Sequence, residues 1–210
     1  MKIAVIGASG KAGNLILKEA EKRGHEATAI VRHAAKITDQ NVGVIEKDIY
    51  DLSSGDLKPY DVVVNAFGAP LGEEEPHVTA GHALIEALKG TDTRVIIVGG
   101  AGSLYVDENT RVIDTPDFPD QFKPTARGQA RNLQELQASQ GLTWTFISPS
   151  AVFDPNGPKT GSYQTGKDNL LVNAKGESYI SYADFAAAVA DEIENPSHLN
   201  ERFTVVGEAE

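Results

Sequence analysis

The chain has 210 residues, 40% of them hydrophobic, and a formal net charge of −11 at pH 7. This length and apolar content suit one domain with a large buried core. The acidic balance, without a cluster of Lys and Arg, argues against nucleic acid and membrane surfaces as partners. The lack of cysteine excludes disulfides and thiolate chemistry. No segment approaches the roughly twenty apolar residues of a membrane span, so we expect a cytoplasmic protein.

Short apolar runs alternate with longer helical segments along the chain. Strands are predicted at 2–6, 26–31, 42–47, 61–66, 94–99, 143–148 and, as a late candidate, 202–206. Helices are predicted after the first strand, ending near Gly24, and at about 77–89, 125–139 and 182–194. The last helix begins where Ser181 and Asp184 have the spacing of a capping box. The alternation predicts one α/β domain over 1–210, with a doubly wound, mainly parallel sheet and helices on both faces.

Two long segments, at 103–124 and 149–178, fit neither strand nor helix. Both are rich in Pro, Gly and Asp, and both follow predicted strands. Ligands of a doubly wound sheet bind beyond the carboxyl ends of its strands. We therefore expect these two segments to build a substrate pocket.

The stretch "VIGASGKAG", residues 5–13, places three glycines between the first strand and the first helix. Gly7 would permit a tight turn, Gly10 would let a pyrophosphate approach the backbone, and Gly13 would let the helix pack closely on the strand. Free N–H groups at the helix N-terminus favour a phosphate there. A glycine-rich turn without a ligand is the alternative. The predicted dinucleotide contacts in this loop are Gly7, Ser9, Gly10, Lys11, Ala12 and Gly13.

The segment "IVRHAAK" after the second strand bears on which dinucleotide binds. Arg32 stands about twenty residues after the loop, where an Asp or Glu would bind the ribose of NAD. A guanidinium pairs with a 2′-phosphate that a carboxylate would repel, so NADP is favoured over NAD. If Arg32 only stacks on the adenine, both cofactors would be accepted. Further cofactor contacts are predicted at His33, Asp48, Ile49, Asn65, Ala66, Phe67, Gly68 and Gly100.

The order of these features resembles the short-chain dehydrogenase/reductase superfamily: the glycine loop, Asp48 after strand three, "NAFG" at 65–68 and "GGAGS" at 99–103. The opening 32 residues, "VIIVGGAGSL", "ARNLQEL" and "YISYADFAAAVADEIE" look like an atypical branch, the NADH-flavin reductases, related to biliverdin IXβ/flavin reductases and NmrA-like proteins. The resemblance implies a Rossmann-type fold and an NAD(P)H-dependent reductase. The branch name implies NADH, whereas Arg32 favours NADP.

Most members of that superfamily reduce carbonyls with a Tyr-x-x-x-Lys pair on the helix after strand five. The corresponding region here reads "FKPTARGQARNL", without a tyrosine. Tyr163 and Lys167 have the spacing, but they lie in a Gly-rich segment after strand six, and we interpret them as a coincidence. A flavin, FMN or FAD, is an acceptor that needs no placed acid, so it is the expected substrate. The alternative is a non-catalytic, NADP(H)-binding redox sensor of the NmrA-like type, acting through a protein partner.

The acceptor is expected against the nicotinamide, under the two long segments. Ser103 is the one catalytic candidate, as a hydrogen-bond donor to the carboxamide or acceptor, although local backbone capping would explain it equally well. Trp144 is assigned to the core, and the scattered histidines suggest no metal site. We expect a small-molecule acceptor and a monomer or homodimer. The predicted acceptor contacts are Pro70, Tyr105, Pro149, Val152 and Phe153.

Overall fold

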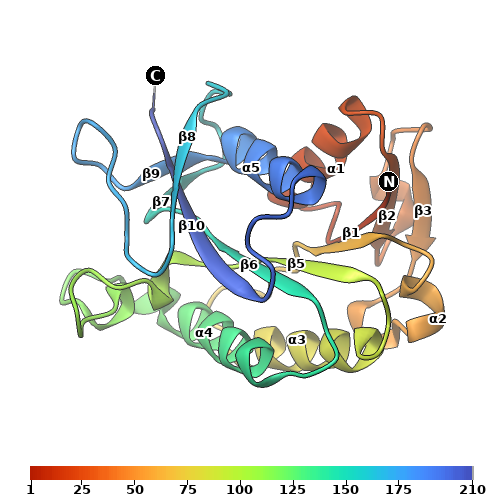
Figure 1. Ribbon diagram of the computed structural model, residues 1–210, viewed down its shortest axis with the longest axis horizontal. Coiled ribbons are helices and arrows are strands. Elements are labelled where there is room, and N and C mark those ends of the chain that lie inside the picture. The colour runs from red at the N-terminus through yellow and green to blue at the C-terminus, as the bar shows by residue number, and fades with distance from the viewer. Residues whose placement is uncertain (210) are drawn as a thin grey trace.

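The computed structural model describes residues 1–209, which fold around one eight-stranded sheet (Figure 1). The strand order is β3-β2-β1-β4-β5-β6-β10-β8, and only β8 runs antiparallel to its neighbour. The order reverses between β1 and β4, which is the topological switch point of a doubly wound sheet. The strands are β1 (Lys2–Ile6), β2 (Glu26–Val31), β3 (Gly43–Glu46), β4 (Val62–Asn65), β5 (Arg94–Val98), β6 (Trp144–Ser148), β8 (Tyr163–Gly166) and β10 (Glu201–Gly207).

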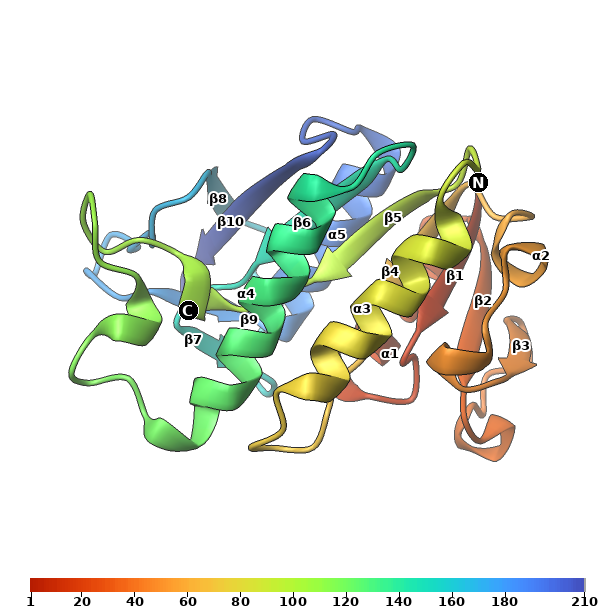
Figure 2. The same ribbon diagram turned by 90° about the horizontal axis from the view of Figure 1, so that it is seen from below.

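Helices cover both faces of the sheet, as predicted. Figure 1 shows α1 (Lys11–Lys22) and α5 (Tyr182–Glu194) on one face, with α3 (Glu75–Leu88) and α4 (Lys123–Ala138) on the other; Figure 2 shows α3 and α4 side by side. The α3 and α4 helices each begin two residues earlier than predicted, because Pro76 and Pro124 are accommodated in their first turns. The short helix α2 (Ser54–Leu57) precedes β4. Among residues 1–209, no helix has the length and apolarity that a bilayer crossing requires.

Two apolar cores fill the space between the sheet and its helical layers. Phe185 and Phe203 belong to the core under α1 and α5. Phe146 and Trp144 belong to the core under α3 and α4, which confirms the assignment of Trp144. The central strands are buried on both faces, and this explains why they read as continuous apolar runs instead of alternating ones.

The long segment 149–178 is more regular than predicted. It contains β7 (Val152–Asp154), which pairs in parallel with β9 (Tyr179–Ser181) in a small second sheet, and it contains β8. The other long segment contains single 3₁₀ turns and an isolated bridge between Tyr105 and Arg111, and its last two residues belong to α4. Tyr163 lies in β8, and its hydroxyl donates a hydrogen bond to Asp191 of α5. The Tyr163 and Lys167 pair is therefore not on a helix, in agreement with its interpretation as a coincidence.

The predicted cap of α5 forms on one side only. The Ser181 hydroxyl accepts a hydrogen bond from the Asp184 N–H at 3.0 Å. The Asp184 carboxylate is fully buried and accepts hydrogen bonds from the Thr160 N–H at 3.1 Å, the Thr160 hydroxyl at 2.6 Å and the Gly161 N–H at 2.8 Å. This carboxylate therefore anchors the segment before β8 to the start of α5.

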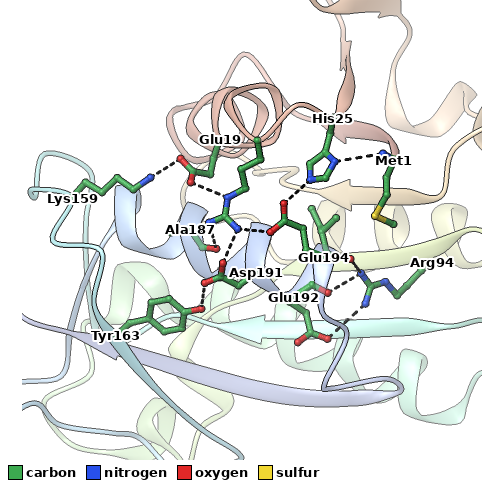
Figure 3. A network of polar contacts seen from close by, with 12 residues as sticks. Met1, Glu19, His25, Arg94, Lys159, Tyr163, Ala187, Asp191, Glu192 and Glu194 are labelled. Atoms are coloured by element: carbon green, nitrogen blue, oxygen red, sulfur yellow. Dashed lines mark hydrogen bonds and ion pairs between the residues drawn. The ribbon is translucent and has the colours of Figure 1, made fainter.

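Ion pairs of Arg23 join the end of α1 to α5. Figure 3 labels the carboxylates of these pairs, Glu19, Asp191 and Glu194. The Arg23 guanidinium donates to Asp191 at 2.6 Å and to Glu194 at 2.8 Å, both on α5, and to Glu19 one turn back at 3.1 Å. Lys159 contacts Glu19 at 2.6 Å from the segment before β8. Burial raises the pKa of Asp191, but hydrogen bonds from Tyr163 and Arg23 outweigh it, so this pKa lies below its ordinary value. The pKa of Glu19 is lowered in the same way, against burial, by Lys159 and Arg23.

Substitution Arg23→Met keeps the apolar stem but removes the guanidinium, so Glu19, Asp191 and Glu194 each lose one of their partners. We expect a loss of unfolding free energy on the order of 2 kcal/mol at pH 7, because the site is neither fully exposed nor fully buried. Lowered carboxyl pKa values stabilise the protein above about pH 4, and this contribution disappears as the pH falls through the folded-state values. Urea unfolding should therefore show a smaller difference from the wild type at pH 3 than at pH 7. Lys22→Met is the control, because Lys22 is a neighbouring exposed cation. Equal losses of unfolding free energy in the two variants would contradict a stabilising role for the Arg23 ion pairs.

Candidate functional site

A cleft of about 510 Å³ lies at the carboxyl ends of β1, β2, β3 and β4. This edge is where the switch point between β1 and β4 leaves room for a ligand. Twelve predicted cofactor residues line the cleft: Gly7, Ser9, Gly10, Lys11, Ala12, Gly13, Arg32, Asp48, Ile49, Ala66, Phe67 and Gly68. The structure thus brings together contacts that are up to about sixty residues apart in the chain.

The glycine loop is held by close backbone contacts. Gly7 has a φ of +75°, and a Cβ there would lie 2.5 Å from the carbonyl oxygen of Ala66. A Cβ at Gly13 would overlap the carbonyl oxygen of Gly7. Gly13 therefore lets α1 pack closely on the loop after β1. The sequence predicts close packing on the strand itself.

The N-terminus of α1 opens onto this cleft without a capping group. Gly10 is its N-cap residue, no side chain caps it, and its first turn contains no acidic residue. The first N–H groups of the helix are therefore available to an anion, and the helix dipole favours negative charge at this end. A dinucleotide pyrophosphate has the charge and the acceptor oxygens that such a terminus binds.

Three cations line the cleft on the side of β2 and β3: Arg32, Lys36 and Lys47. Arg32 and Lys36 are exposed, and neither has an ion-pair partner among residues 1–209. Lys47 pairs with Asp56 at 2.7 Å, and Lys47 and the Ser53 hydroxyl hold the pKa of Asp56 at about 2. The Asp48 carboxylate accepts a hydrogen bond from the Tyr50 N–H at 3.2 Å. Sequence reasoning missed Lys47, which directly precedes the predicted Asp48.

Three predicted cofactor residues lie outside this cleft. His33 is exposed and precedes a 3₁₀ turn, without lining the cleft. Asn65 is buried, and its Oδ1 accepts a hydrogen bond from the Phe67 N–H at 3.0 Å. It therefore shapes the loop after β4 from beneath. Gly100 lines a second pocket instead, described next.

This second pocket, of about 580 Å³, lies beside the first at the carboxyl ends of β5 and β6. Two of the predicted acceptor residues, Pro149 and Phe153, line it. The chain between β5 and α4 contributes Phe118 and Phe122, and the first turns of α4 contribute Thr125, Ala126 and Gln129. We call this the acceptor pocket.

Two polar side chains on the pocket-facing side of α4 have no hydrogen-bond partner in the described chain. Neither Thr125 nor Gln129 makes a side-chain hydrogen bond within residues 1–209. Gln129 packs against Gly100, where a Cβ would overlap its Oε1. Gly100 is therefore required for Gln129 to reach the pocket wall.

Four predicted residues line neither of these pockets, so their expected roles are corrected. The Ser103 hydroxyl accepts a hydrogen bond at 3.0 Å from Arg202, whose guanidinium also pairs with Asp168 at 2.7 Å. Ser103 thus anchors Arg202 in this structure and lines neither pocket. Tyr105 forms backbone bridges to Arg111 and Asn169, because the two long segments meet there. Pro70 and Val152 are exposed.

Tyr182, which sequence reasoning missed, lines both the cofactor cleft and the acceptor pocket. It is the first residue of α5, and its ring packs on Phe153 with the centroids 3.9 Å apart. The Phe153 ring in turn packs on that of Phe185 in the core, with the ring centroids 4.8 Å apart. Burial raises the pKa of the Tyr182 hydroxyl, so this group stays protonated at neutral pH. The sequence signal for this role is that Tyr182 is an aromatic residue at the start of α5, directly after the short strand β9.

Substitution Gly13→Ala should weaken dinucleotide binding, because the new methyl group must displace the Gly7 carbonyl and with it the loop. We expect NADPH to bind roughly tenfold more weakly, which corresponds to about 1.4 kcal/mol. Gly68→Ala is the matched control, since Gly68 also lines the cleft but a Cβ there has no neighbour within 4 Å. Fluorescence titration with NADPH measures both variants, and equal affinities would contradict the proposed role of the close contact.

Comparison with known proteins identifies the family. The family model described as NAD(P)H-binding matches residues 7–196. The chain is 62% identical to the uncharacterised protein YwnB of Bacillus subtilis over the full length of both. A crystal structure from Streptococcus pneumoniae, described as a proposed NADH-flavin reductase, is 46% identical with a TM-score of 0.93, covering 99% of this chain and 100% of the other.

A more distant relative has a named activity. The NAD(P)H azoreductase of Xenophilus azovorans is 25% identical, covering 98% of this chain and 68% of that protein. The match to the family model spans the glycine loop, both pockets and α5. The chain belongs to the NAD(P)H-binding family, as an atypical short-chain dehydrogenase/reductase whose structural neighbours include the NADH-flavin reductases.

Proposed function

We propose that the protein is an NAD(P)H-dependent reductase that transfers hydride to a flavin or a similar planar, conjugated acceptor. The carrying observation is that Tyr182 forms a wall of both the cofactor cleft and the acceptor pocket. A nicotinamide at the end of the cleft and an acceptor in the pocket would therefore meet beside one aromatic ring. The names of the Streptococcus protein and the Xenophilus azoreductase support acceptors of this class.

The helix α4 suits an acceptor that needs no proton donor at the place where most of the superfamily has its tyrosine. Thr125 and Gln129 face the pocket from α4, and α4 contains no Tyr-x-x-x-Lys pair. A bound flavin would supply a ring nitrogen that accepts the hydride. The negative charge of the reduced flavin is delocalised over its rings, and water can protonate this anion. The task of the protein is then to orient two rings against each other and to exclude water. Phe118 and Phe153 offer apolar faces for this.

Stopped-flow mixing with NADPH and FMN tests the proposal. We expect NADPH oxidation well above the uncatalysed background. Tyr182→Ala should lower kcat/KM by roughly tenfold, because it removes the shared wall, an effect of about 1.4 kcal/mol. Tyr182→Phe keeps the ring and should stay within about twofold of the wild type, a change of roughly 0.4 kcal/mol.

Other outcomes of these measurements point elsewhere. Background rates with flavins and quinones would contradict the reductase. Tight dinucleotide binding without turnover would support the redox-sensor alternative. A Tyr182→Phe variant as slow as Tyr182→Ala would show that the hydroxyl itself participates, against an acceptor that needs no acid.

We also propose that NADP(H) is the preferred dinucleotide. Arg32 and Lys36 line the cleft without ion-pair partners in the described chain, and Lys47 adds a third cation. This cluster complements the additional phosphate of NADP, which NAD lacks. The preference rests on these cations and not on the names of relatives, one of which specifies NADH and another NAD(P)H.

Substitution Arg32→Asp should reverse the preference between NADPH and NADH. The new carboxylate repels the 2′-phosphate and accepts hydrogen bonds from the ribose of NADH. We expect the ratio of the two dissociation constants to change by at least roughly tenfold. Lys18→Asp is the matched control, because Lys18 is an exposed cation of α1 away from the cleft. Equal weakening of both dinucleotides would instead indicate that Arg32 only stacks on the adenine.

A further inference from the structure

A third cavity, of about 550 Å³, adjoins the acceptor pocket. Thr115 lines both, so the two cavities share one wall. The new cavity lies between α4 and the chain at 111–116, part of the segment that Figure 2 shows leading into α4. We call it the basic groove, for the charges described next. The cofactor cleft, the acceptor pocket and the basic groove thus follow one another, joined at Tyr182 and at Thr115.

The lining of the basic groove is richer in cations than the protein as a whole. The chain as a whole has 30 acidic and 19 basic residues, yet the lining of this groove has twice as many cations as acids. The cations are Arg111, Lys123, Arg127 and Arg131, and the acids are Glu74 and Asp114. Two further acids outside this lining, Asp120 and Glu75, pair with Lys123 and Arg131, so four carboxylates face the four cations. Attraction of an anion therefore depends on a cation whose charge is not already paired.

The cations of the groove are not equally engaged. Arg111 pairs with Asp114 at 2.8 Å, and Lys123 pairs with Asp120 at 2.6 Å, which fixes both side chains. Arg127 is the exception, since its nearest carboxylate among the described residues is Glu74 at 4.0 Å, at the limit of an ion pair.

The carboxylate near Arg127 is shared with a second arginine, which approaches its other oxygen. Glu74 pairs more closely with Arg131, at 3.2 Å. The Arg127 guanidinium therefore retains donors for a ligand. A guanidinium binds phosphate or carboxylate through two parallel hydrogen bonds, which gives such a contact both strength and orientation.

We infer that the basic groove binds the anionic tail of the acceptor whose planar ring occupies the acceptor pocket, with Arg127 as the principal contact. This inference rests on the proposed function. It narrows the acceptor to planar molecules that carry a phosphate or carboxylate on a flexible arm. Among flavins it selects FMN over riboflavin, which has the same ring and the same ribityl chain but no phosphate.

Paired kinetics with FMN and riboflavin test the inference. With NADPH as donor, the wild type should have a kcat/KM roughly tenfold higher for FMN. Arg127→Ala should remove most of that advantage and leave riboflavin within about twofold, because riboflavin has no group for Arg127 to bind. Arg127→Glu should place FMN below riboflavin. Lys18→Glu makes the same charge change on α1, away from the groove, and should leave the ratio unchanged.

Salt supplies a second readout. The FMN advantage should shrink between about 0.05 and 0.5 M ionic strength as the charges are screened, whereas riboflavin kinetics should stay constant. An FMN to riboflavin ratio near one in the wild type would overturn the inference. So would equal losses for both flavins in Arg127→Ala.

Equilibrium binding separates this inference from the proposed function. Quenching of flavin fluorescence measures the affinity of each flavin without turnover. If neither flavin is reduced but FMN binds more tightly, and only while Arg127 is present, the anion site stands and the reductase fails. If both flavins are reduced equally well and Arg127→Ala changes nothing, the reductase stands and the anion site fails.

Discussion

The carbonyl of Gly7 leaves no room for a side chain at Gly13, and the carbonyl of Ala66 leaves no room for one at Gly7. These two contacts hold the end of β1, the start of α1 and the loop after β4 at backbone distance from one another. Because they involve main-chain atoms, no rotamer change can relieve them. The open N-terminus of α1 and the position of Phe67 both depend on this junction, and so does the cleft between them.

The helical layer on the α1 and α5 side connects this junction to the rest of the site. The α1 helix begins at the glycine loop and ends at Arg23, which is fastened to the far end of α5. The α5 helix in turn begins with Tyr182, at the boundary of the cleft and the acceptor pocket. One rigid pair of helices therefore supplies a phosphate-binding terminus and an aromatic wall, so the relative position of the two does not depend on a surface loop.

Prediction from sequence succeeded where local chemistry determines the structure. The strand at 26–31 and the helix at 182–194 have the predicted bounds. A continuous apolar run indicates a buried strand, and a periodic apolar pattern with a cap indicates where a helix begins and which face it buries. The glycine loop was equally legible, since a turn with positive φ requires Gly7 whatever lies around it. In contrast, β7 and β9 are three residues each and depend on pairing with each other.

Side-chain direction was the main source of error at the site. Ser103 has the expected position after β5, but its hydroxyl accepts a hydrogen bond from Arg202 of β10, about a hundred residues later, and it does not line the pocket. Lys47 and Tyr182 line the site because of tertiary packing, for which the sequence offers only a weak local signal. The residues that line a pocket from loops are therefore less predictable than those fixed by the backbone.

The anchoring of Ser103 also bears on how the family diversifies. Arg202 ties Ser103 to Asp168, and Tyr105 exchanges backbone hydrogen bonds with 168–170, so the two long segments are joined at their bases. Beyond that joint, the chain at 115–122 supplies pocket walls such as Phe118 without belonging to the sheet. Doubling the length of such a loop costs only about 0.6 kcal/mol in chain entropy. Insertions and exchanges in this stretch would therefore change the walls of this pocket at little cost to the sheet and the glycine loop.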